Sequence, residues 1–365
     1  MLIATIMLTL TTPGAEPDWA QWRGPNRDGI IAGKAWPTTL NGLEQNWQIN
    51  LAESYSGPIV TRDRIFVTET AGRKMEIVRA LNRKTGKQIW EAKWTGSLSV
   101  PFFARSNGSW IRATPAFDGD SLYVAGMRDV LVCLNAANGE ERWRVDFRKR
   151  YKTPLPAFGF VSSPLVTSDS VYVQAGASVV KLDKKTGKSS WRSLNDGGGM
   201  FGSAFSSPVL ATLAGKKKLV VQTRTRLAGL DLTNGNVLWT QKVQASRGMN
   251  ILTPNVQNDQ ILTSAYGGKT HLFEVSQSKG KFSVKEKWNV PIQGYMSSPV
   301  VIDGHAYLHL KNRRFCCINL KTGKETWRSK KPFGRYWSMI AQKNQILALD
   351  ETGILYLIEA NPNKL

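Results

Sequence analysis

The chain is poor in the side chains that most often carry catalysis. Its 365 residues include only three cysteines and three histidines. Three cysteines cannot form the disulfide framework of a small secreted domain, and no carboxylate or cysteine stands at ligand spacing from a histidine. No glycine-rich phosphate loop opens a helix. We therefore predict no catalytic residue, no metal site and no bound cofactor.

Helical periodicity and acidic side chains are also scarce. Alternation of apolar and polar residues recurs instead, as in Ser121–Ala125 and Ser170–Gln174, which is typical of half-buried strands. The 49 Lys and Arg against 27 Asp and Glu give a net charge of +22. This balance favours acidic partners, such as an anionic polymer or an envelope component, without choosing among them. We expect no specific nucleic-acid partner.

No apolar run is long enough to cross a bilayer, so we expect no transmembrane span in the mature chain. The first residues, Met1–Thr12, resemble the core of an export signal, although no Lys or Arg precedes them. We expect residues 1–15 to be an export signal, and the protein to be periplasmic or in the cell envelope. The alternatives are an incorrectly assigned start or a short membrane-associated tail.

What the sequence has in abundance is one repeat. A short apolar strand leads into a turn of the form Asp/Asn-x-x-Thr/Asn-Gly, and a tryptophan follows four residues after the glycine, as in Asn319 to Trp327. The tryptophans recur every 39 to 53 residues, with a degenerate copy at the sixth and a truncated one at the first. A period of this size with several strands per unit predicts a β-propeller. The tryptophans are Trp47, Trp90, Trp143, Trp191, Trp239, Trp288 and Trp327.

The turn residues explain the repeat. Asp or Asn can bond the backbone ahead of it, and glycine supplies the positive φ that a bulged hairpin needs. The tryptophan then returns on the next strand, where its ring can be buried between neighbouring sheets while the indole N–H finds a partner. We predict that all seven tryptophans dock one sheet against the next and take no part in catalysis.

The fold class is therefore all-β. We predict a monomeric ring of seven four-stranded antiparallel blades, with eight blades as the alternative. Because the chain ends before an eighth tryptophan is due, residues 46–51 are expected to supply the fourth strand of the last blade and close the ring. Residues 16–45 form an irregular arm, and residues 46–365 form the single propeller domain.

The two faces of this ring differ in character. Lysines and arginines at the repeat turns predict a basic ring on one face, which either keeps the protein soluble or docks an anionic partner. The connections between blades carry aromatic residues and arginines around the mouth of the channel. They suit a protein or a small anionic or aromatic ligand, unless the aromatics merely plug the channel. The candidate binding residues are Tyr55, Trp110, Arg112, Phe160, Phe205, Asn250, Tyr295, Arg335, Tyr336 and Trp337.

These motifs resemble a known family. The repeat is similar to the tryptophan-docking repeat of quinoprotein-like (pyrroloquinoline quinone, PQQ-like) β-propellers, and Trp19–Asn26 with Gly29 resembles the start of exported PQQ-binding-like propellers of planctomycete-type bacteria. The superfamily includes dehydrogenases and cofactor-free scaffolds. The dehydrogenases use Ca²⁺, a catalytic Asp and a vicinal disulfide. Cys316 and Cys317 imitate that pair but precede a docking turn, so we expect two thiols.

The scaffold branch includes the propeller lipoprotein of outer-membrane barrel assembly, which the chain resembles in size and motif without a cysteine near the leader. The favoured hypothesis is a non-catalytic exported scaffold that binds a protein or small ligand at the channel mouth. One alternative is a PQQ-dependent oxidoreductase with Ca²⁺, and another is a basic adaptor for an anionic polymer.

Overall fold

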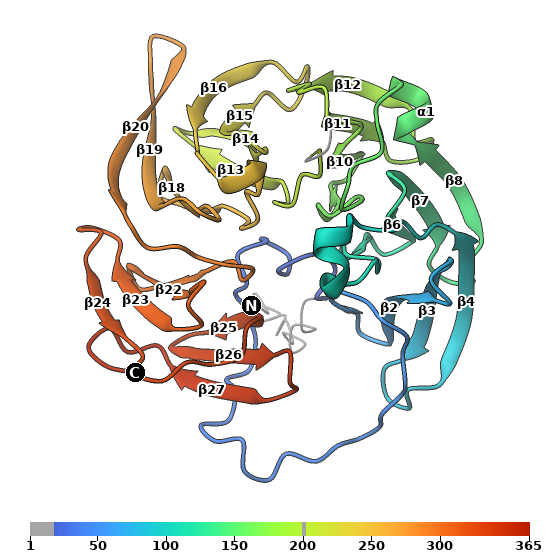
Figure 1. Ribbon diagram of the computed structural model, residues 1–365, viewed down its shortest axis with the longest axis horizontal. Helices are drawn as coiled ribbons and strands as arrows, with labels where there is room; N and C mark the ends of the chain where they lie inside the picture. The colour runs from blue at the N-terminus through green and yellow to red at the C-terminus, as the bar shows by residue number, and fades with distance from the viewer. Residues whose placement is uncertain (1–17, 199–201) are drawn as a thin grey trace, which may run out of the picture.

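The structure, a computed structural model, describes residues 18–198 and 202–365, so the expected export signal lies outside the described residues. The described chain forms seven antiparallel sheets that stand around a common centre (Figure 1). In every sheet the strands follow one another in chain order. The fold is all-β and consistent with a seven-bladed propeller. No helix in the described part of the chain is long and apolar enough to cross a membrane.

The sheets are numbered here in chain order. Sheet 1 contains β1 (Ile59–Val60), β2 (Arg64–Ala71), β3 (Met75–Asn82) and β4 (Gln88–Thr95); sheet 2 contains β5 (Ala116–Phe117), β6 (Ser121–Gly126), β7 (Val130–Asn135) and β8 (Glu141–Asp146); sheet 3 contains β9 (Leu165–Val166), β10 (Ser170–Ala175), β11 (Ser178–Asp183) and β12 (Ser189–Ser193); sheet 4 contains β13 (Val209–Leu213), β14 (Lys216–Gln222), β15 (Arg226–Leu230) and β16 (Val237–Lys242).

Sheet 5 contains β17 (Asn255–Gln257), β18 (Gln260–Ser264), β19 (Thr270–Ser278) and β20 (Lys281–Val290); sheet 6 contains β21 (Val300–Ile302), β22 (His305–His309), β23 (Phe315–Asn319) and β24 (Glu325–Arg328); sheet 7 contains β25 (Trp337–Gln342), β26 (Gln345–Asp350) and β27 (Leu355–Glu359). Three short helices lie in connections: η1 (Phe102–Asn107), α1 (Phe147–Tyr151) and η2 (Ser246–Gly248).

The repeat turn has the predicted chemistry, as sheet 3 illustrates. The carboxylate of Asp183 accepts hydrogen bonds from the backbone N–H and the hydroxyl of Thr186, at 2.8 and 2.7 Å. Gly187 has a φ of 67°, and the pairing register shifts between Lys181 and Leu182. The bulge lets the hairpin turn tightly and still present the following tryptophan to the neighbouring sheet.

Tryptophan docking is confirmed for six of the seven tryptophans. Trp143 donates its indole N–H to the carbonyl of Lys184 in the next sheet's turn at 3.1 Å. Its ring lies over Gly187, where a Cβ atom would come within 2.7 Å of the ring, so only glycine fits. The same type of bond joins Trp47 to Arg83, Trp90 to Ala136, Trp191 to Leu232, Trp288 to Leu320 and Trp327 to Asn361.

Trp239 is the exception. Its ring is buried in the core between sheets 4 and 5, but its indole N–H has no hydrogen-bond partner within the described chain. The next sheet departs from the repeat here, because β19 and β20 run on as a long hairpin instead of forming a docking turn (Figure 1).

A second set of contacts joins the sheets near the channel. The backbone N–H of the residue before a strand-opening proline donates to the hydroxyl of its counterpart in the next sheet, and the pattern repeats five times. The series runs through Gly57, Thr114, Ser163, Ser207, Thr253 and Ser298. It explains why Ser or Thr recurs before these prolines, which start the innermost strands as predicted.

The N-terminal arm crosses the centre of the ring. Trp19 exchanges backbone hydrogen bonds with Val60 in sheet 1, and Gly29 accepts one from Ala341 in sheet 7. Between them, Arg23 donates to the carbonyls of Ser298 and Pro299, and Arg27 donates to those of Ser163 and Pro164. The arm therefore ties together inner strands that lie on opposite sides of the channel.

Both arm arginines are buried without a carboxylate within ion-pair distance in the residues described. Burial lowers the pKa of Arg23 to about 10 and that of Arg27 to about 9. Both guanidinium groups therefore stay charged at neutral pH, and backbone carbonyls take the place of counter-ions.

The expected closing strand does not form. Residues 46–51 are not assigned to a strand, and sheet 7 has three strands. The segment is held towards sheet 1 instead, because Trp47 bonds Arg83, and the backbone N–H of Ala52 donates to the Glu69 carboxylate at 2.5 Å. The prediction of a fourth strand from residues 46–51 is therefore wrong for this structure, although Trp47 does dock as the predicted tryptophan of the last blade.

Replacing tryptophan by phenylalanine isolates the docking hydrogen bond. Trp143→Phe removes a donor from the Lys184 carbonyl, whereas Trp239→Phe removes an N–H that is already unpartnered. Both lose similar ring volume. We expect Trp143→Phe to lower the free energy of unfolding by about 1 kcal/mol more than Trp239→Phe. Urea unfolding of the two variants measures this difference, and equal losses would show that the bond does not stabilise the ring.

Candidate functional site at the channel mouth

Five of the predicted binding residues meet at the channel mouth and are called the mouth cluster. The Cζ atom of Arg112, before sheet 2, lies 4.8 Å from the ring centre of Tyr55, before sheet 1. Tyr295, before sheet 6, stacks on Tyr336, before sheet 7, with centroids 5.8 Å apart and planes at 9°. Arg335 reaches the Tyr295 hydroxyl at 3.5 Å and lies over the Tyr336 ring. Four sheets thus contribute to one surface.

Backbone contacts hold these side chains in place. The backbone N–H of Tyr55 donates to the carbonyl of Ile111 at 2.9 Å, and Arg112 donates to the carbonyl of Gly108 at 2.7 Å. On the other side, the Glu351 carboxylate accepts the backbone N–H groups of Arg335 and Tyr336 at 2.7 and 3.0 Å. Because Glu351 is in the turn after β26, sheet 7 itself orients this part of the cluster.

The mouth cluster combines permanent positive charge with neutral phenols. Burial raises the pKa of Tyr336 to about 12 and also raises that of Tyr55. Burial lowers the pKa of Arg112, while the hydrogen bond to Tyr295 raises that of Arg335. None of these shifts brings a charge change near neutral pH. The cluster can stack on planar groups and donate charge-assisted hydrogen bonds to an anion.

Other side chains extend this surface. The ring of Trp110 lies 5.1 Å from that of Tyr55. On the far side, Tyr266 lies 5.9 Å from Tyr295, and the Lys311 ammonium lies 4.9 Å from the Tyr266 ring. Sequence reasoning missed Tyr266 and Lys311 because it followed only the connections between sheets. The turn between the second and third strands of a blade lies on the same face as the connections between blades. Inspecting these turns in the sequence would have identified Tyr266 and Lys311 as candidates.

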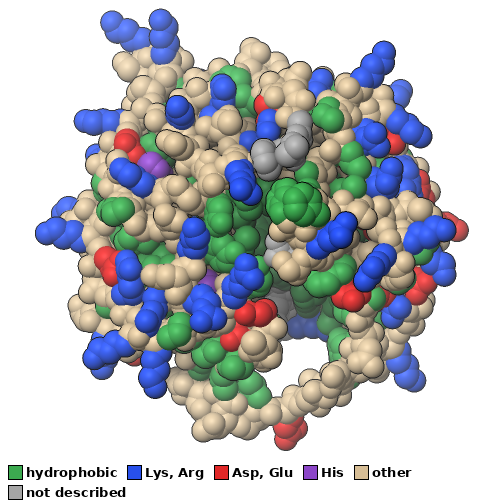
Figure 2. All heavy atoms as spheres, viewed as in Figure 1, with side chains coloured by type: hydrophobic (Ala, Val, Ile, Leu, Met, Phe, Trp, Pro, Cys, Tyr) green, Lys and Arg blue, Asp and Glu red, His purple; other side chains and the backbone are tan. Residues whose placement is uncertain are grey.

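The loop before sheet 2 adds exposed aromatics. Phe102 and Phe103 of η1 have 78% and 47% of their surface exposed, and their rings meet edge to face. In Figure 1 this short helix lies over the centre of the ring. Figure 2, from the same side, shows apolar side chains around a central hollow and Lys and Arg spread around the rim. The face is apolar at its centre and basic at its edge.

Four predicted binding residues are buried, and three of them, Phe160, Asn250 and Trp337, do not join Tyr295 in the mouth cluster. Phe160 packs edge to face on Phe147 in the core between sheets 2 and 3. Asn250 uses its side-chain amide to bond the carbonyl of Thr223 at 2.9 Å. Trp337 begins β25 and stacks on His309 with centroids 4.9 Å apart. Phe160 and Asn250 lie in irregular connections, where no alternation shows the direction of a side chain, whereas Trp337 is the first residue of a strand.

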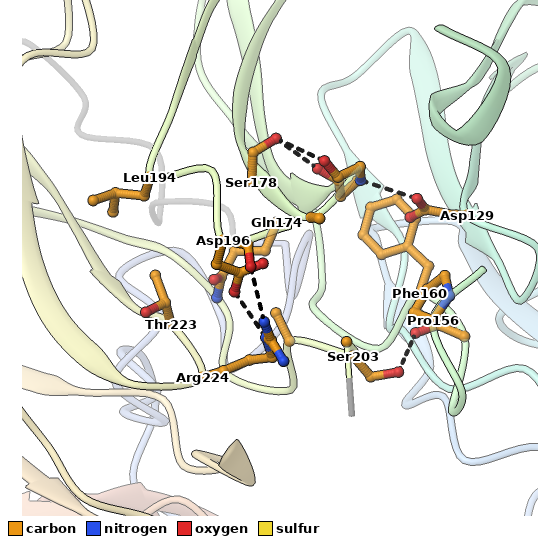
Figure 3. Close-up of a pocket in the computed structure, with 16 residues that line it drawn as sticks. Asp129, Pro156, Phe160, Gln174, Ser178, Leu194, Asp196, Ser203, Thr223 and Arg224 are labelled. Carbon is orange, nitrogen blue, oxygen red and sulfur yellow. Dashed lines mark hydrogen bonds and ion pairs between the residues drawn. The ribbon is translucent and has the colours of Figure 1, made fainter. Parts of the chain in front are cut away.

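Phe205 is partly buried and packs on Phe158, so it supports the wall of the mouth. Behind it lies a cavity of about 20 Å³ lined by Phe160, Asp129 and the ion pair of Asp196 and Arg224 (Figure 3). The volume suits a single water molecule. Burial raises the pKa of Asp129 to about 6, and its carboxylate accepts the backbone N–H of Gly176.

The cysteines are buried free thiols, as predicted. Cys316 belongs to the core between sheets 5 and 6, whereas Cys317 belongs to the core between sheets 6 and 7. Adjacent residues of a strand point to opposite faces, so β23 holds the two sulfur atoms apart. Within the described residues, no group of three His, Cys, Asp or Glu side chains is placed to hold a metal ion.

Docking turns that recur around a ring of seven sheets define a β-propeller built from PQQ-like repeats. The family described as outer membrane protein assembly factor BamB matches residues 74–329, which is more than half of the chain. The chain therefore belongs to this family.

Individual relatives agree with this assignment. The chain is 24% identical to the outer membrane protein assembly factor BamB of Moranella endobia over 84% of its own length and 76% of the relative's. It is 21% identical to that of Yersinia pestis over 80% and 70%. The crystal structure of BamB from Moraxella catarrhalis superimposes with a TM-score of 0.62 at 16% identity, covering 81% of this chain and 82% of the other. This similarity establishes the fold.

The buried side chain of His309 makes the free energy of unfolding depend on pH. Burial lowers its pKa to about 4 from 6.5. The unfolded chain therefore binds the proton first, and stability falls as the pH drops from 6.5 to 4. The loss is at most about 3 kcal/mol. His309→Gln should remove this dependence while keeping a donor for Gly334. Urea unfolding at pH 4.5 and 7 tests it, and an unchanged pH dependence in the variant would contradict the assignment.

Proposed function

We propose that the protein is a non-catalytic, exported propeller scaffold that binds another protein of the cell envelope through the mouth cluster. The observation that carries the proposal is the convergence of Tyr55, Arg112, Tyr295, Arg335 and Tyr336 from four sheets on one face. Aromatic rings and arginines that share a surface are the residues in which binding energy concentrates at protein interfaces.

The surroundings of the cluster favour a protein over a small ligand. The face is open and extends from the cluster to Phe102 and Phe103, both exposed. A small molecule is usually enclosed by its pocket, but neither the cavity of about 20 Å³ beside Phe160 nor that of about 280 Å³ beside Arg27 is lined by a residue of the mouth cluster. Membership of the assembly-factor family supports a role in the assembly of outer membrane proteins. A small anionic or aromatic ligand remains a candidate for the same stacking groups.

The two alternative functions have weaker support. Solved structures of PQQ-linked alcohol dehydrogenases superimpose with TM-scores of 0.48 or less, too low to carry an argument about a quinone. A basic adaptor would use the lysines and arginines of the docking turns, for which the net charge of +22 is the supporting observation. The mouth cluster is the more specific feature.

Site-specific photocrosslinking in the cell tests the proposal. A photoreactive phenylalanine analogue replaces Tyr336 in the full chain, and a matched variant carries it in place of Lys285 on the exposed outer strand β20. We expect an envelope protein to crosslink to position 336 at least ten times more strongly than to position 285. Equal crosslinking at both positions, or none at position 336, would contradict a partner-binding mouth.

The pKa shifts also predict how the interaction responds to pH. Because burial raises the pKa of Tyr336 to about 12 and the hydrogen bond to Tyr295 raises that of Arg335, these two groups keep their charge states between pH 6 and 8. Co-purification of the partner with the unsubstituted protein should therefore be constant across this range. A sharp change would mean that another titrating group on this protein or its partner controls binding.

A further inference from the structure

The ring has apolar cores at six of its seven junctions. Each of the first six pairs of consecutive sheets shares a buried cluster of side chains. Within the described residues, no such cluster joins sheet 7 to sheet 1. Figure 1 shows the two sheets apart, with the chain arching across the outside between them. The ring is therefore open at one junction.

The face of sheet 7 that lines this opening is apolar. Leu349 is paired with Leu355, and Leu347 with Leu357, so the four leucines project from one face of β26 and β27. The opposite face, with Ile346 and Ala348, belongs to the core shared with sheet 6. Leu349 and Leu355 have 47% and 41% of their surface exposed. These four side chains are called the leucine face.

The outer edge of sheet 7 is also unpaired. Among residues 18–198 and 202–365, β27 pairs with β26 alone, whereas the third strand of every other sheet has a fourth strand beside it. In the described part of the chain, no further strand bonds to residues 355–359, and the one additional backbone bond there joins Asn361 to Glu359. An edge strand presents backbone N–H and C=O groups that another strand can pair with.

The segment that spans the opening, residues 38–46, is called the strap. At one end, Gln345 donates to the carbonyl of Pro37. At the other, Trp47 donates to the carbonyl of Arg83. Between these anchors the strap makes internal hydrogen bonds, such as that from the backbone N–H of Leu43 to the carbonyl of Leu40. Figure 2 shows an opening between the strap and the body of the ring.

We propose that the free edge of β27 binds an extended segment of another polypeptide, which adds to sheet 7 as its fourth strand and covers the leucine face. Strand addition to an open edge supplies affinity through backbone hydrogen bonds and specificity through alternate side chains. The site is separate from the mouth cluster, so this inference goes beyond the proposed function and can fail independently of it.

The six complete sheets define the chemistry of the occupant. Their fourth strands run antiparallel to the third and range from the four residues of β24 to the ten of β20. A partner on the five-residue β27 should be an extended segment of similar length, with apolar side chains at alternate positions to meet Leu355 and Leu357. Acidic flanking residues are favoured because the chain carries a net charge of +22.

A synthetic peptide tests the edge directly. The probe is a fluorescein-labelled heptapeptide that alternates valine or leucine with threonine between terminal aspartates, and its control has proline at the centre. Anisotropy with the full chain should show binding of the first peptide and at least tenfold weaker binding of the second. Hydrogen exchange should slow in residues 355–359 on binding. Binding without this protection would place the peptide elsewhere and overturn the proposal.

Exposed-residue variants give the matched comparison. Leu355→Lys places a charge on the leucine face and should weaken peptide binding at least tenfold. Val237→Lys makes a similar change at an exposed position of β16, on the outer strand of sheet 4, and should leave binding unchanged. Equal effects would contradict a site at β27. Crosslinking from position 336 should be unaffected by Leu355→Lys, which separates this proposal from that for the mouth cluster.

The chain's own segment is the competing occupant. If residues 46–51 filled the edge in solution, amides of residues 355–359 that do not bond β26 would already be protected in the free protein, and Ile49→Pro would release them. That result would overturn the proposal. Rapid exchange of these amides in the free chain, with protection on peptide binding, is the expected result.

Discussion

The indole hydrogen bond between consecutive sheets is the interaction on which the ring depends. Five of the seven tryptophans lie over the turn glycine of the following sheet, and the indole N–H meets a carbonyl of that turn, as Trp143 does with Lys184. The bond forms only when the turn glycine has a positive φ and a bulge follows on the strand. This one contact therefore explains the fixed spacing between the turn Asp or Asn, the glycine and the tryptophan. Nearer the channel, the Ser and Thr hydroxyls make a second series of contacts between sheets. Together they fix the angle between neighbouring blades.

The N-terminal arm joins inner strands that are not neighbours in the ring. Docking tryptophans join only neighbours, but Arg23 and Arg27 reach inner strands on different sides of the channel. Their buried charges are stabilised by backbone carbonyls, whose positions depend on correctly formed inner strands. The arm thus stabilises the ring from its centre, while one junction at its periphery stays open.

Much of the fold was predictable because its determinants are local. The turn Asp183 to Gly187 and its tryptophan lie within a few residues of one another, so the repeat, the sheet order and the docking role could be read from spacing. The closing strand could not. Residues 46–51 could either pair with β27 or be held at sheet 1 through Arg83 and Glu69. Both positions depend on residues far away in the sequence, so no local pattern predicts which one forms.

Part of the mouth cluster was predictable because its residues recur at similar positions in the repeat. Tyr55, Arg112, Tyr295, Arg335 and Tyr336 occupy corresponding places before the inner strands, and the geometry of the ring brings them together. Phe160, Asn250 and Trp337 come from similar connections but turn into cores. Side-chain direction in irregular backbone depends on packing partners far away in the sequence, and these cannot be inferred from alternation.

The most direct test of a partner-binding mouth is quantitative co-purification from the native cell envelope. Full-length protein with Arg112→Gln and Tyr336→Ala is compared with a rim variant, Lys84→Gln and Lys185→Gln, which removes exposed charges from two docking turns. The account predicts that an associated envelope protein is lost with the mouth variant and retained with the rim variant. Retention by the mouth variant and loss by the rim variant would contradict it, and would instead support a basic adaptor.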